Sequence, residues 1–240
     1  MALSGTVATG TLRSDMEVLI AGGHGKVARH LIRLLAAAGH TARAVIRNPA
    51  HAADVEADGG VPVVCDLEHD DVRPHAGGMD AIVFAAGAGP GSGAERKRTM
   101  DLGGAVACIE AAEEQGVDRF VMVSSIGAHA PEQGPEPMRP YLQAKADADA
   151  RLQRSALRWT IVRPGSLKDE PGTGLVDVST ALGRSGPVPR ADVALVIAAA
   201  LDEDGTAGLV FEVLAGDTPA HEAVRSLAGN PSTSQPSPRP

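Results

Sequence analysis

The sequence predicts an α/β fold, a doubly wound parallel sheet whose two faces are covered by helices. Short apolar runs rich in β-branched residues alternate with longer segments of helical period through most of the chain, a pattern typical of a parallel sheet with crossover helices. Most of the runs are apolar throughout, as strands buried on both faces usually are. A glycine-rich turn directly follows the first run, which favours a strand–turn–helix unit at the start of the sheet.

Length and composition limit the size and the surroundings of this fold. The 240 residues suffice for one domain or at most two, and 43% of them are hydrophobic and 22% charged, an ordinary globular balance. The net charge is −8 and no run of Lys or Arg stands out, so we expect no nucleic-acid partner. The longest apolar run, Val193–Leu201, is about half a membrane span. Because Met1–Thr11 also lacks the pattern of a secretory signal, we expect a cytoplasmic protein with no membrane partner.

The alternation of apolar runs and helical segments predicts seven strands and six helices. The predicted strands are Glu17–Ala21, Thr41–Ile46, Val61–Cys65, Ala81–Ala86, Arg119–Ser124, Thr160–Arg163 and Leu209–Leu214. The predicted helices are Lys26–Ala38, Pro49–Asp58, a short one before Met79, Glu95–Gln115, Tyr141–Ala156 and Ala191–Leu201. In the first helix the apolar residues recur at three- and four-residue steps and form one stripe, made of Val27, Leu31, Leu34 and Leu35. Gly39 then ends this helix, as a C-terminal glycine commonly does.

One domain, residues 17–225, is expected to contain all of these elements between two flexible tails. Residues 1–16 are small and polar, and residues 226–240 are rich in Pro, Ser, Asn and Gly, which predicts little order at either end. Beyond Pro164 the alternation weakens, with one more helix and one more strand. This part is too short for an independent domain, so we expect a small C-terminal cap on the sheet.

A glycine-rich turn joins the first strand to the first helix, with the sequence Gly22-Gly23-His24-Gly25-Lys26-Val27-Ala28. Gly22 permits a tight turn, and Gly25 leaves room for the backbone to approach a pyrophosphate. The helix N-terminus supplies amide donors and the positive end of a dipole. Such a pattern also occurs in ordinary strand-to-helix turns, but its place after the first strand predicts a dinucleotide site of the Rossmann type, contacted by residues 22–27.

The end of the second strand distinguishes between the two pyridine nucleotides. An acidic residue usually binds the ribose hydroxyls of NAD at this position, whereas this chain has Arg47. A guanidinium there would pair with the 2′-phosphate of NADP, so we expect NADP, with NAD less favoured; the alternative for Arg47 is a solvated loop residue. The other expected cofactor contacts follow the third and fourth strands, where Asp66 touches the adenine edge and small residues let the cofactor cross the sheet: Asp66, Leu67, Ala85, Ala86 and Gly87.

Neither a metal site nor a disulfide is expected. The acidic run Asp66–Asp71 includes a histidine, but consecutive residues seldom converge on one ion, so a polar surface turn is the better interpretation. The eight histidines show no HxxxH or HExxH spacing. Cys65 and Cys108 lie far apart in apolar surroundings, which predicts two small buried thiols.

A tyrosine and a lysine form the candidate catalytic pair. Tyr141 is the only tyrosine of the chain and Lys145 follows four residues later, so a helix places both side chains on one face. A nearby ammonium stabilises the phenolate anion, which allows Tyr141 to act as a general acid or base. The alternative is an exposed helical pair without a role.

Two serines complete the candidate catalytic set. Ser124 and Ser125 lie at the carboxyl end of the fifth strand, where ligands of open α/β sheets bind. A serine hydroxyl at this position can donate a hydrogen bond to a substrate carbonyl. Neither serine lies in a GxSxG elbow, so a hydrolase nucleophile is disfavoured.

Together these motifs resemble the atypical short-chain dehydrogenases/reductases of the NAD(P)H-binding, NmrA-like group. The resemblance rests on GGHGKVA after the first strand, the VSS end of the fifth strand, YLQAK and IVRPG, and it extends over residues 17–217. It implies a Rossmann fold in which Tyr141 is the proton donor or acceptor, Lys145 holds the nicotinamide ribose and one of the two serines orients the substrate. It also implies that the nicotinamide end of the cofactor is lined by Arg163, Pro164 and Gly165.

The chain departs from this group at two points. Many relatives carry an asparagine on the fourth helix where this chain has Asp101, so the usual water-relay role of that residue is in doubt here. The segment after Gly165 is also shorter than in the sugar-nucleotide epimerases of the superfamily, which disfavours a bulky nucleotide-sugar substrate.

The expected function is an NADP-dependent oxidoreductase that transfers a hydride to or from a small carbonyl-type substrate, with Tyr141 transferring the proton. Two alternatives use the same cofactor: a non-catalytic NADP(H)-binding redox sensor, and an NAD(P)-dependent epimerase or dehydratase without net reduction. The intact Tyr141 and Lys145 favour the enzyme, because sensors of this group often lack the tyrosine. The substrate pocket is expected between Ile126–Pro140 and Leu167–Arg190. A homodimer through the helices Glu95–Gln115 and Tyr141–Ala156 is a further expectation from the resemblance.

Overall fold

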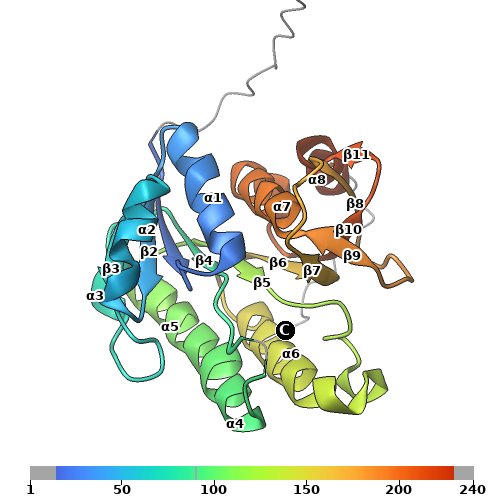
Figure 1. The fold of residues 1–240 in the computed structure, drawn as a ribbon, viewed down its shortest axis with the longest axis horizontal. Helices are drawn as coiled ribbons and strands as arrows, with labels where there is room; N and C mark the ends of the chain where they lie inside the picture. The colour runs from blue at the N-terminus through green and yellow to red at the C-terminus, as the bar shows by residue number, and fades with distance from the viewer. Residues whose placement is uncertain (1–14, 90, 230–240) are drawn as a thin grey trace, which may run out of the picture.

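A nine-stranded sheet forms the centre of the computed structural model, which describes residues 15–89 and 91–229 (Figure 1). Its strands are β1 Glu17–Ala21, β2 Thr41–Ile46, β3 Val61–Val64, β4 Ala81–Phe84, β5 Arg119–Val123, β6 Arg158–Pro164, β8 Leu175–Ser179, β10 Leu209–Ala215 and β11 Thr218–Pro219. They follow the spatial order β11-β8-β10-β6-β5-β4-β1-β2-β3. From β10 to β3 the neighbours are parallel, whereas β8 runs antiparallel to both β10 and β11. The strand order reverses between β1 and β4, where an open α/β sheet binds its ligands.

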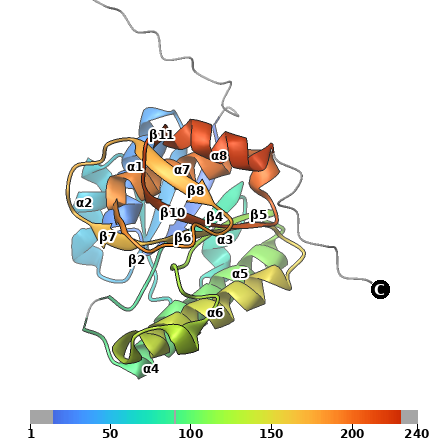
Figure 2. The same ribbon diagram turned by 90° about the vertical axis from the view of Figure 1, so that its right-hand side faces the viewer.

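Helices cover both faces of this sheet, as Figure 2 shows. They are α1 Lys26–Ala37, α2 Ala52–Ala57, α3 Arg73–Ala76, α4 Ala94–Arg96, α5 Ala105–Gln115, α6 Arg139–Gln153, α7 Arg190–Asp202 and α8 Ala220–Ala228. On one face α1, α7 and α8 bury side chains such as Leu31 and Ile197, and on the other α5 and α6 bury Ile109 and Leu152. The predicted doubly wound Rossmann-type architecture is therefore confirmed. No helix within the two described ranges has both the length and the apolar character needed to cross a membrane.

Every strand predicted from the sequence is present, with its ends shifted by no more than two residues. The predicted helix Glu95–Gln115 differs, because it consists of α4, a π-helix over Lys97–Gly104 and α5. A π-helix has a wider turn than an α-helix, and the neighbouring glycines Gly103 and Gly104 weaken the preference for a regular α-helix at its end. The predicted helix Pro49–Asp58 begins with a 3₁₀ turn, whose N-terminus is capped by the Asn48 side chain, and continues as α2.

The region after Pro164 extends the sheet and is more regular than the expected small cap. Strand β8 pairs with β10 at the edge of the sheet, and a separate two-stranded parallel unit consists of β7 Ser166–Lys168 and β9 Pro187–Pro189. The sequence analysis missed β8 because its polar residues and its Gly-rich surroundings obscure the apolar pattern. An edge strand is half exposed and needs fewer apolar residues than a central one.

The ordered part of the chain is longer at both ends than predicted. Helix α8 continues to Ala228, so residues 226–228 are helical and do not belong to a flexible tail. Met16 is buried, and its backbone N–H donates to His40 Nδ1 at 3.2 Å. The remaining parts of the two predicted tails, residues 1–14 and 230–240, lie outside the described residues.

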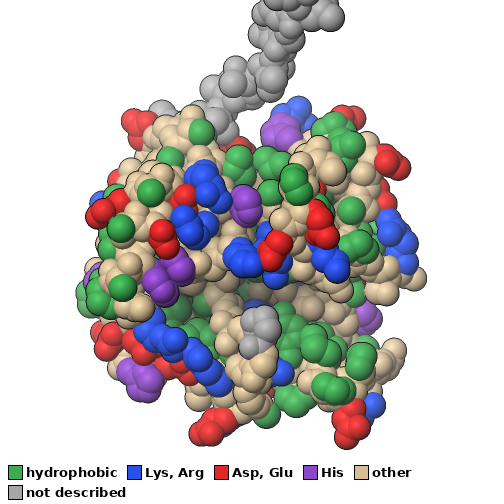
Figure 3. Space-filling model, in the orientation of Figure 1, with side chains coloured by type: hydrophobic (Ala, Val, Ile, Leu, Met, Phe, Trp, Pro, Cys, Tyr) green, Lys and Arg blue, Asp and Glu red, His purple; other side chains and the backbone are tan. Residues whose placement is uncertain are grey.

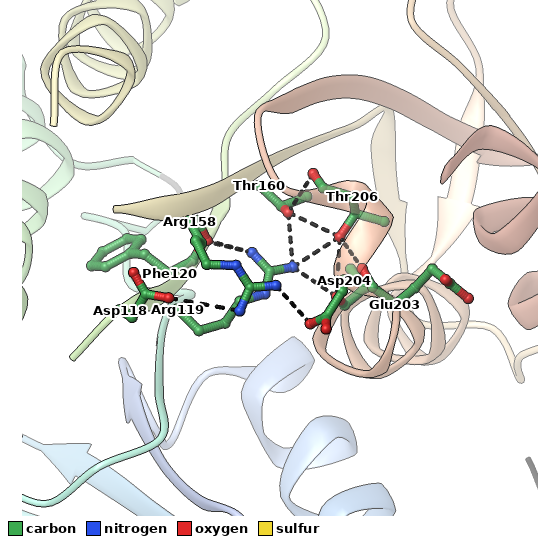
Figure 4. Close-up of polar contacts among 9 residues, drawn as sticks. Asp118, Arg119, Phe120, Arg158, Thr160, Glu203, Asp204 and Thr206 are labelled. Atoms are coloured by element: carbon green, nitrogen blue, oxygen red, sulfur yellow. Dashed lines mark hydrogen bonds and ion pairs between the residues drawn. The ribbon is translucent and has the colours of Figure 1, made fainter. Parts of the chain in front are cut away.

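A buried arginine ties β5, β6 and α7 together at the amino ends of the strands (Figure 4). Arg119 is 6% exposed and donates to Thr160 Oγ1 at 2.8 Å, to Thr206 Oγ1 at 2.8 Å and to the carbonyl of Ala200 at 2.7 Å. Ala200 lies in the last turn of α7, where unpaired carbonyls and the helix dipole favour a cation. This cluster therefore stabilises the end of the domain opposite the carboxyl ends of the strands.

Candidate functional site

The glycine-rich turn packs tightly between β2 and β4. Gly22 has φ 79, and a Cβ atom on it would lie 2.6 Å from the Cα of Ala86. A Cβ on Gly23 would lie 2.5 Å from that of Ala44, so a side chain would displace backbone at either position. Gly25 is the N-cap residue of α1 and makes no side-chain capping hydrogen bond. The first amide groups of α1 thus lack a side-chain acceptor and are oriented to bind an anion.

A cavity of about 400 Å³ opens above this turn, and Figure 3 shows the hollow on this face of the molecule. Nine of the residues predicted to bind the cofactor line it: Gly22, His24, Gly25, Arg47, Asp66, Leu67, Ala85, Ala86 and Gly87. The sequence analysis missed several others, among them Asn48, His51, Cys65, Arg96 and Met100. A glycine turn, a helix N-terminus without a side-chain cap and a cavity of this volume fit the pyrophosphate and adenosine parts of a dinucleotide.

Three other predicted cofactor residues have different surroundings. Gly23 packs on β2, as described, and Val27 is buried in the core of the α1 face. Lys26 is largely exposed, and its Nζ donates to Asp169 Oδ2 at 2.5 Å. Asp169 also accepts from Arg190 at the start of α7. This charged contact joins the N-termini of α1 and α7 across the carboxyl edge of the sheet.

Charged side chains gather at the end of the cavity beside β2. Glu68 Oε2 lies 3.6 Å from Arg47 and 3.4 Å from Arg96. Nearby the rings of His24 and His51 stack with centroids 3.6 Å apart, and His24 Nε2 lies 2.8 Å from Asp54 Oδ2. The hydrogen bond to His24 lowers the pKa of Asp54. This end of the cavity therefore combines two guanidiniums with two imidazoles, a composition that suits an anionic ligand group.

Asp66 is engaged with its own loop. Its carboxylate accepts from the backbone N–H of Glu68 at 3.1 Å and lies 3.2 Å from His69 Nδ1. The acidic run Asp66–Asp71 thus forms a hydrogen-bonded turn, as the sequence analysis expected. Within the described residues, no group of three or more His, Cys, Asp or Glu side chains is arranged to hold a metal ion.

The candidate catalytic lysine is buried beside Ala86, which lines the cavity, but Lys145 does not line the cavity itself. Lys145 is 3% exposed, and its Nζ donates to the carbonyl of Val123 at 3.1 Å and lies 3.3 Å from Asp101 Oδ1. The same Nζ lies 3.5 Å from the carbonyl of Ala86, which lines the cavity, and 5.9 Å from the ring centroid of Tyr141. The pair on α6 predicted from the sequence is thus brought to the sheet edge, and the ammonium has a buried carboxylate partner.

The sequence analysis singled out Asp101 but did not predict that it pairs with Lys145. Asp101 lies on the π-helix and is 1% exposed. Its second oxygen, Oδ2, accepts from the backbone N–H of Ala88 at 3.2 Å. Asp101 therefore links Lys145 to the loop after β4 that borders the cavity.

The two candidate serines have different partners. Ser124 is 2% exposed and donates its hydroxyl to Asp149 Oδ2 at 2.9 Å. Ser125 is half-buried, and its hydroxyl donates to the neighbouring carbonyl of Ile126 at 3.1 Å. Ser124 thus belongs to an internal hydrogen-bond network, and Ser125 is the more exposed of the two serines.

The segment predicted to line the nicotinamide end also faces inward. Arg163 donates to Asp149 Oδ2 through Nε at 3.0 Å and through a terminal nitrogen at 2.8 Å. Burial raises the pKa of Asp149, and Arg163 opposes this increase. Pro164 is buried, and a Cβ on Gly165 would lie 2.2 Å from the carbonyl oxygen of Gly186. These three residues support the sheet edge, and a direct contact with a ligand stays a prediction.

Both cysteines are buried free thiols, as predicted. Cys65 lines the cavity, and burial together with nearby acidic residues raises its pKa to about 11. Burial raises the pKa of Cys108 to about 12. Because the thiolate is the reactive form, burial disfavours nucleophilic reactivity of both cysteines.

Comparison with known proteins agrees with this geometry. A family model described as NAD(P)H-binding matches residues 22–204. The sugar epimerase YhfK of Bacillus subtilis, itself uncharacterized, is 40% identical over 215 residues, which make up 88% of this chain and 100% of that protein. A solved structure described as a candidate NAD-dependent epimerase/dehydratase from Bacillus halodurans is 45% identical with a TM-score of 0.85, over 88% of this chain and 100% of that one. The oxidoreductase ylbE from Lactococcus lactis is 29% identical with a TM-score of 0.78, over 90% and 98% of the two chains.

The match to the family model and the similarity along nearly the whole length of these relatives agree with the turn, the cavity and the fold. The protein therefore belongs to the NAD(P)H-binding family of atypical, NmrA-like short-chain dehydrogenases/reductases, a group of oxidoreductases and epimerases with a Rossmann-type fold.

Proposed function

We propose that the protein is an NADP-dependent oxidoreductase that transfers a hydride to or from a small carbonyl-type substrate. The observation that carries the proposal is the position of Lys145, whose Nζ lies 3.5 Å from the cavity-lining carbonyl of Ala86 and 5.9 Å from the ring centroid of Tyr141. A bound nicotinamide would supply or accept the hydride at this edge of the sheet. The oxidoreductase ylbE, which is similar along its whole length, supports the same class of reaction.

Different residues bind the two ends of the cofactor. The turn of Gly22 and Gly25 and the N-terminus of α1 bind the pyrophosphate, and Arg47 pairs with the 2′-phosphate. Lys145, fixed by Asp101, holds the nicotinamide ribose.

At the reacting end, Tyr141 donates a proton to the substrate oxygen during reduction and accepts it during oxidation. Ser125 donates a hydrogen bond to the same oxygen. Ser124 keeps the sheet edge in place through Asp149. Proximity of cofactor and substrate at this edge supplies much of the rate.

Nucleotide binding is the first test. Fluorescence titration is expected to show a lower Kd for NADPH than for NADH, because only NADPH offers a phosphate to Arg47. Arg47→Ala is expected to remove most of this preference and to leave the Kd for NADH nearly unchanged. Equal affinities of the wild-type protein for the two nucleotides would refute the assignment of NADP.

Turnover is the second test. Aldehydes, ketones and quinones are incubated with NADPH, and oxidation of the cofactor is followed for the wild-type protein and for Tyr141→Phe. We expect at least one substrate whose reduction falls about 100-fold or more in the variant, as loss of a general acid usually causes. If both proteins bind NADPH and are equally inert across the panel, a redox sensor accounts better for the site.

An epimerase or dehydratase is the second candidate function, favoured by the names of the relatives from Bacillus subtilis and Bacillus halodurans. It would use the same Tyr141 and Lys145 and return the hydride to the substrate, so the cofactor is not consumed. Substrate conversion without any net change in NADPH absorbance would identify this activity and exclude net reduction.

A further inference from the structure

A single carboxylate joins two arginines at the adenosine end of the cavity. Glu68 follows β3 and has a side chain only 11% exposed. Its Oε2 faces Arg47 and Arg96, and its Oε1 accepts from Thr99 Oγ1 at 2.5 Å. The two arginines come from distant parts of the chain, the loop after β2 and the end of α4, yet both line the cavity.

The arginines retain donors for a ligand. Arg47 uses NH1 and Arg96 uses Nε toward Glu68, and their side chains are 52% and 41% exposed. Among the residues the structure describes, no further hydrogen bond or ion pair engages either guanidinium. Their remaining N–H groups are therefore available at the cavity wall, and each guanidinium carries five donors in total.

The spacing of the arginines suits one phosphate group. Both nitrogens approach the same oxygen of Glu68, so they lie no more than about 7 Å apart. A phosphate with oxygens about 2.5 Å apart, accepting hydrogen bonds of about 2.8 Å, can bridge nitrogens up to about 8 Å apart. A ribose hydroxyl carries no charge, so it can accept hydrogen bonds from the guanidiniums but offers them no ion pair.

We propose that Arg96 is a second ligand of the 2′-phosphate beside Arg47, and that Glu68 is the competing anion that holds the pair when the phosphate is absent. This inference rests on the proposed use of NADP. Around Oε2 of Glu68 two cations face one anion, and the carboxylate of Asp66, which lines the same cavity, also acts on Arg47. A phosphate therefore competes with carboxylates for the two guanidiniums. Binding shifts the guanidiniums from Glu68 toward the phosphate.

Fragments without nicotinamide test the proposal independently of turnover. Calorimetric titration compares 2′,5′-ADP with 5′-AMP for the wild-type protein, Arg96→Gln and Arg98→Gln. Arg98 lies two residues further along, is exposed and does not line the cavity, so its variant is the matched control for lost charge. Arg96→Gln is expected to weaken the binding of 2′,5′-ADP about tenfold and the binding of 5′-AMP less than about twofold. Arg98→Gln is expected to change both affinities by less than about twofold.

Glu68→Gln tests the competing anion. Glutamine removes the charge and keeps one acceptor oxygen for the arginines, while its amide NH2 can donate to the Thr99 hydroxyl instead of accepting from it. We therefore expect 2′,5′-ADP to bind about threefold to tenfold more tightly and 5′-AMP to be unaffected. Weaker or unchanged binding of 2′,5′-ADP would overturn the role of Glu68. Equal effects of Arg96→Gln and Arg98→Gln would overturn the role of Arg96. If the wild-type protein binds neither these fragments nor NADPH, the proposed function itself fails.

Discussion

The carboxylate of Asp101 lies 3.3 Å from the ammonium of Lys145, and both side chains are almost completely buried. The ammonium that could stabilise a phenolate at Tyr141 is therefore already compensated by an anion. In a buried environment charges interact over several ångströms. The carboxylate thus offsets part of the positive charge that Lys145 presents to Tyr141, which an asparagine at position 101 would not do.

Replacing Asp101 with asparagine is expected to destabilise the fold, because the buried ammonium of Lys145 then lacks its carboxylate partner. The free energy of unfolding in urea is expected to fall by about 3 kcal/mol. Asp147→Asn, an exposed change on α6, is the control. An unchanged free energy of unfolding in Asp101→Asn would show that the carboxylate does not stabilise the buried ammonium.

Removing Arg163 is expected to destabilise the fold in a pH-dependent manner. Burial raises the pKa of Asp149 and Arg163 opposes this, so Arg163→Gln raises that pKa further. A carboxyl whose folded pKa exceeds its unfolded value stabilises the fold at low pH and loses this contribution as the pH rises through the folded pKa. The loss of stability is therefore expected to be about 3 kcal/mol at pH 8 and smaller at about pH 5.

Urea unfolding at several pH values measures this loss. The double variant Arg163→Gln/Asp149→Asn removes the titrating group, so its loss of free energy of unfolding relative to wild type is expected to be the same at each pH. If Arg163→Gln loses as much free energy of unfolding at acidic as at alkaline pH, an ionised and unpaired Asp149 is not the cause of the loss.

The Arg119 cluster is expected to govern stability without affecting nucleotide binding. Arg119→Met removes the partner of Thr160, Thr206 and the Ala200 carbonyl, which we expect to lower the free energy of unfolding by about 3 kcal/mol. Arg158→Gln, a change at a more exposed arginine beside Asp204, is expected to lower it by less than about 1 kcal/mol. NADPH affinity is expected to stay within about twofold of wild type in both folded variants, and a larger change would show coupling across the sheet.

Removing the charge of Asp169 is expected to favour an anion at the glycine-rich turn. Asp169 pairs with Lys26 and Arg190, so Asp169→Asn frees both cations beside the N-terminus of α1. NADPH is expected to bind about twofold to fivefold more tightly at low ionic strength, with the gain disappearing at high salt. Glu170→Gln, the exposed neighbour, controls for net charge; an equal gain in that variant would rule out a specific role for Asp169.

The sequence predicts the central sheet well because each buried parallel strand carries its own signal. The apolar runs of β1 and β5 need no knowledge of their neighbours to be recognised. Strand β8 carries no such signal, since its position depends on pairing with β10 at the sheet edge. Prediction from local pattern thus fails where tertiary contacts determine the structure.

The same distinction applies to the site. The glycine-rich turn and the spacing of Tyr141 and Lys145 are local, and the structure brings them to one edge of the sheet. The partners that set the charge of the site come from elsewhere in the chain: Asp101 for Lys145, Asp149 for Ser124, and Glu68 for Arg47. Each of these carboxylates lies in a helix or loop whose orientation the sequence pattern does not reveal.

The π-helix over Lys97–Gly104 connects the two ends of the cavity mechanically. It carries Thr99, which contacts Glu68, and Asp101, which contacts Lys145, and Arg96 directly precedes it. A shift of this one stretch would therefore disturb the phosphate-end and the lysine-end contacts together, although neither end had been mutated.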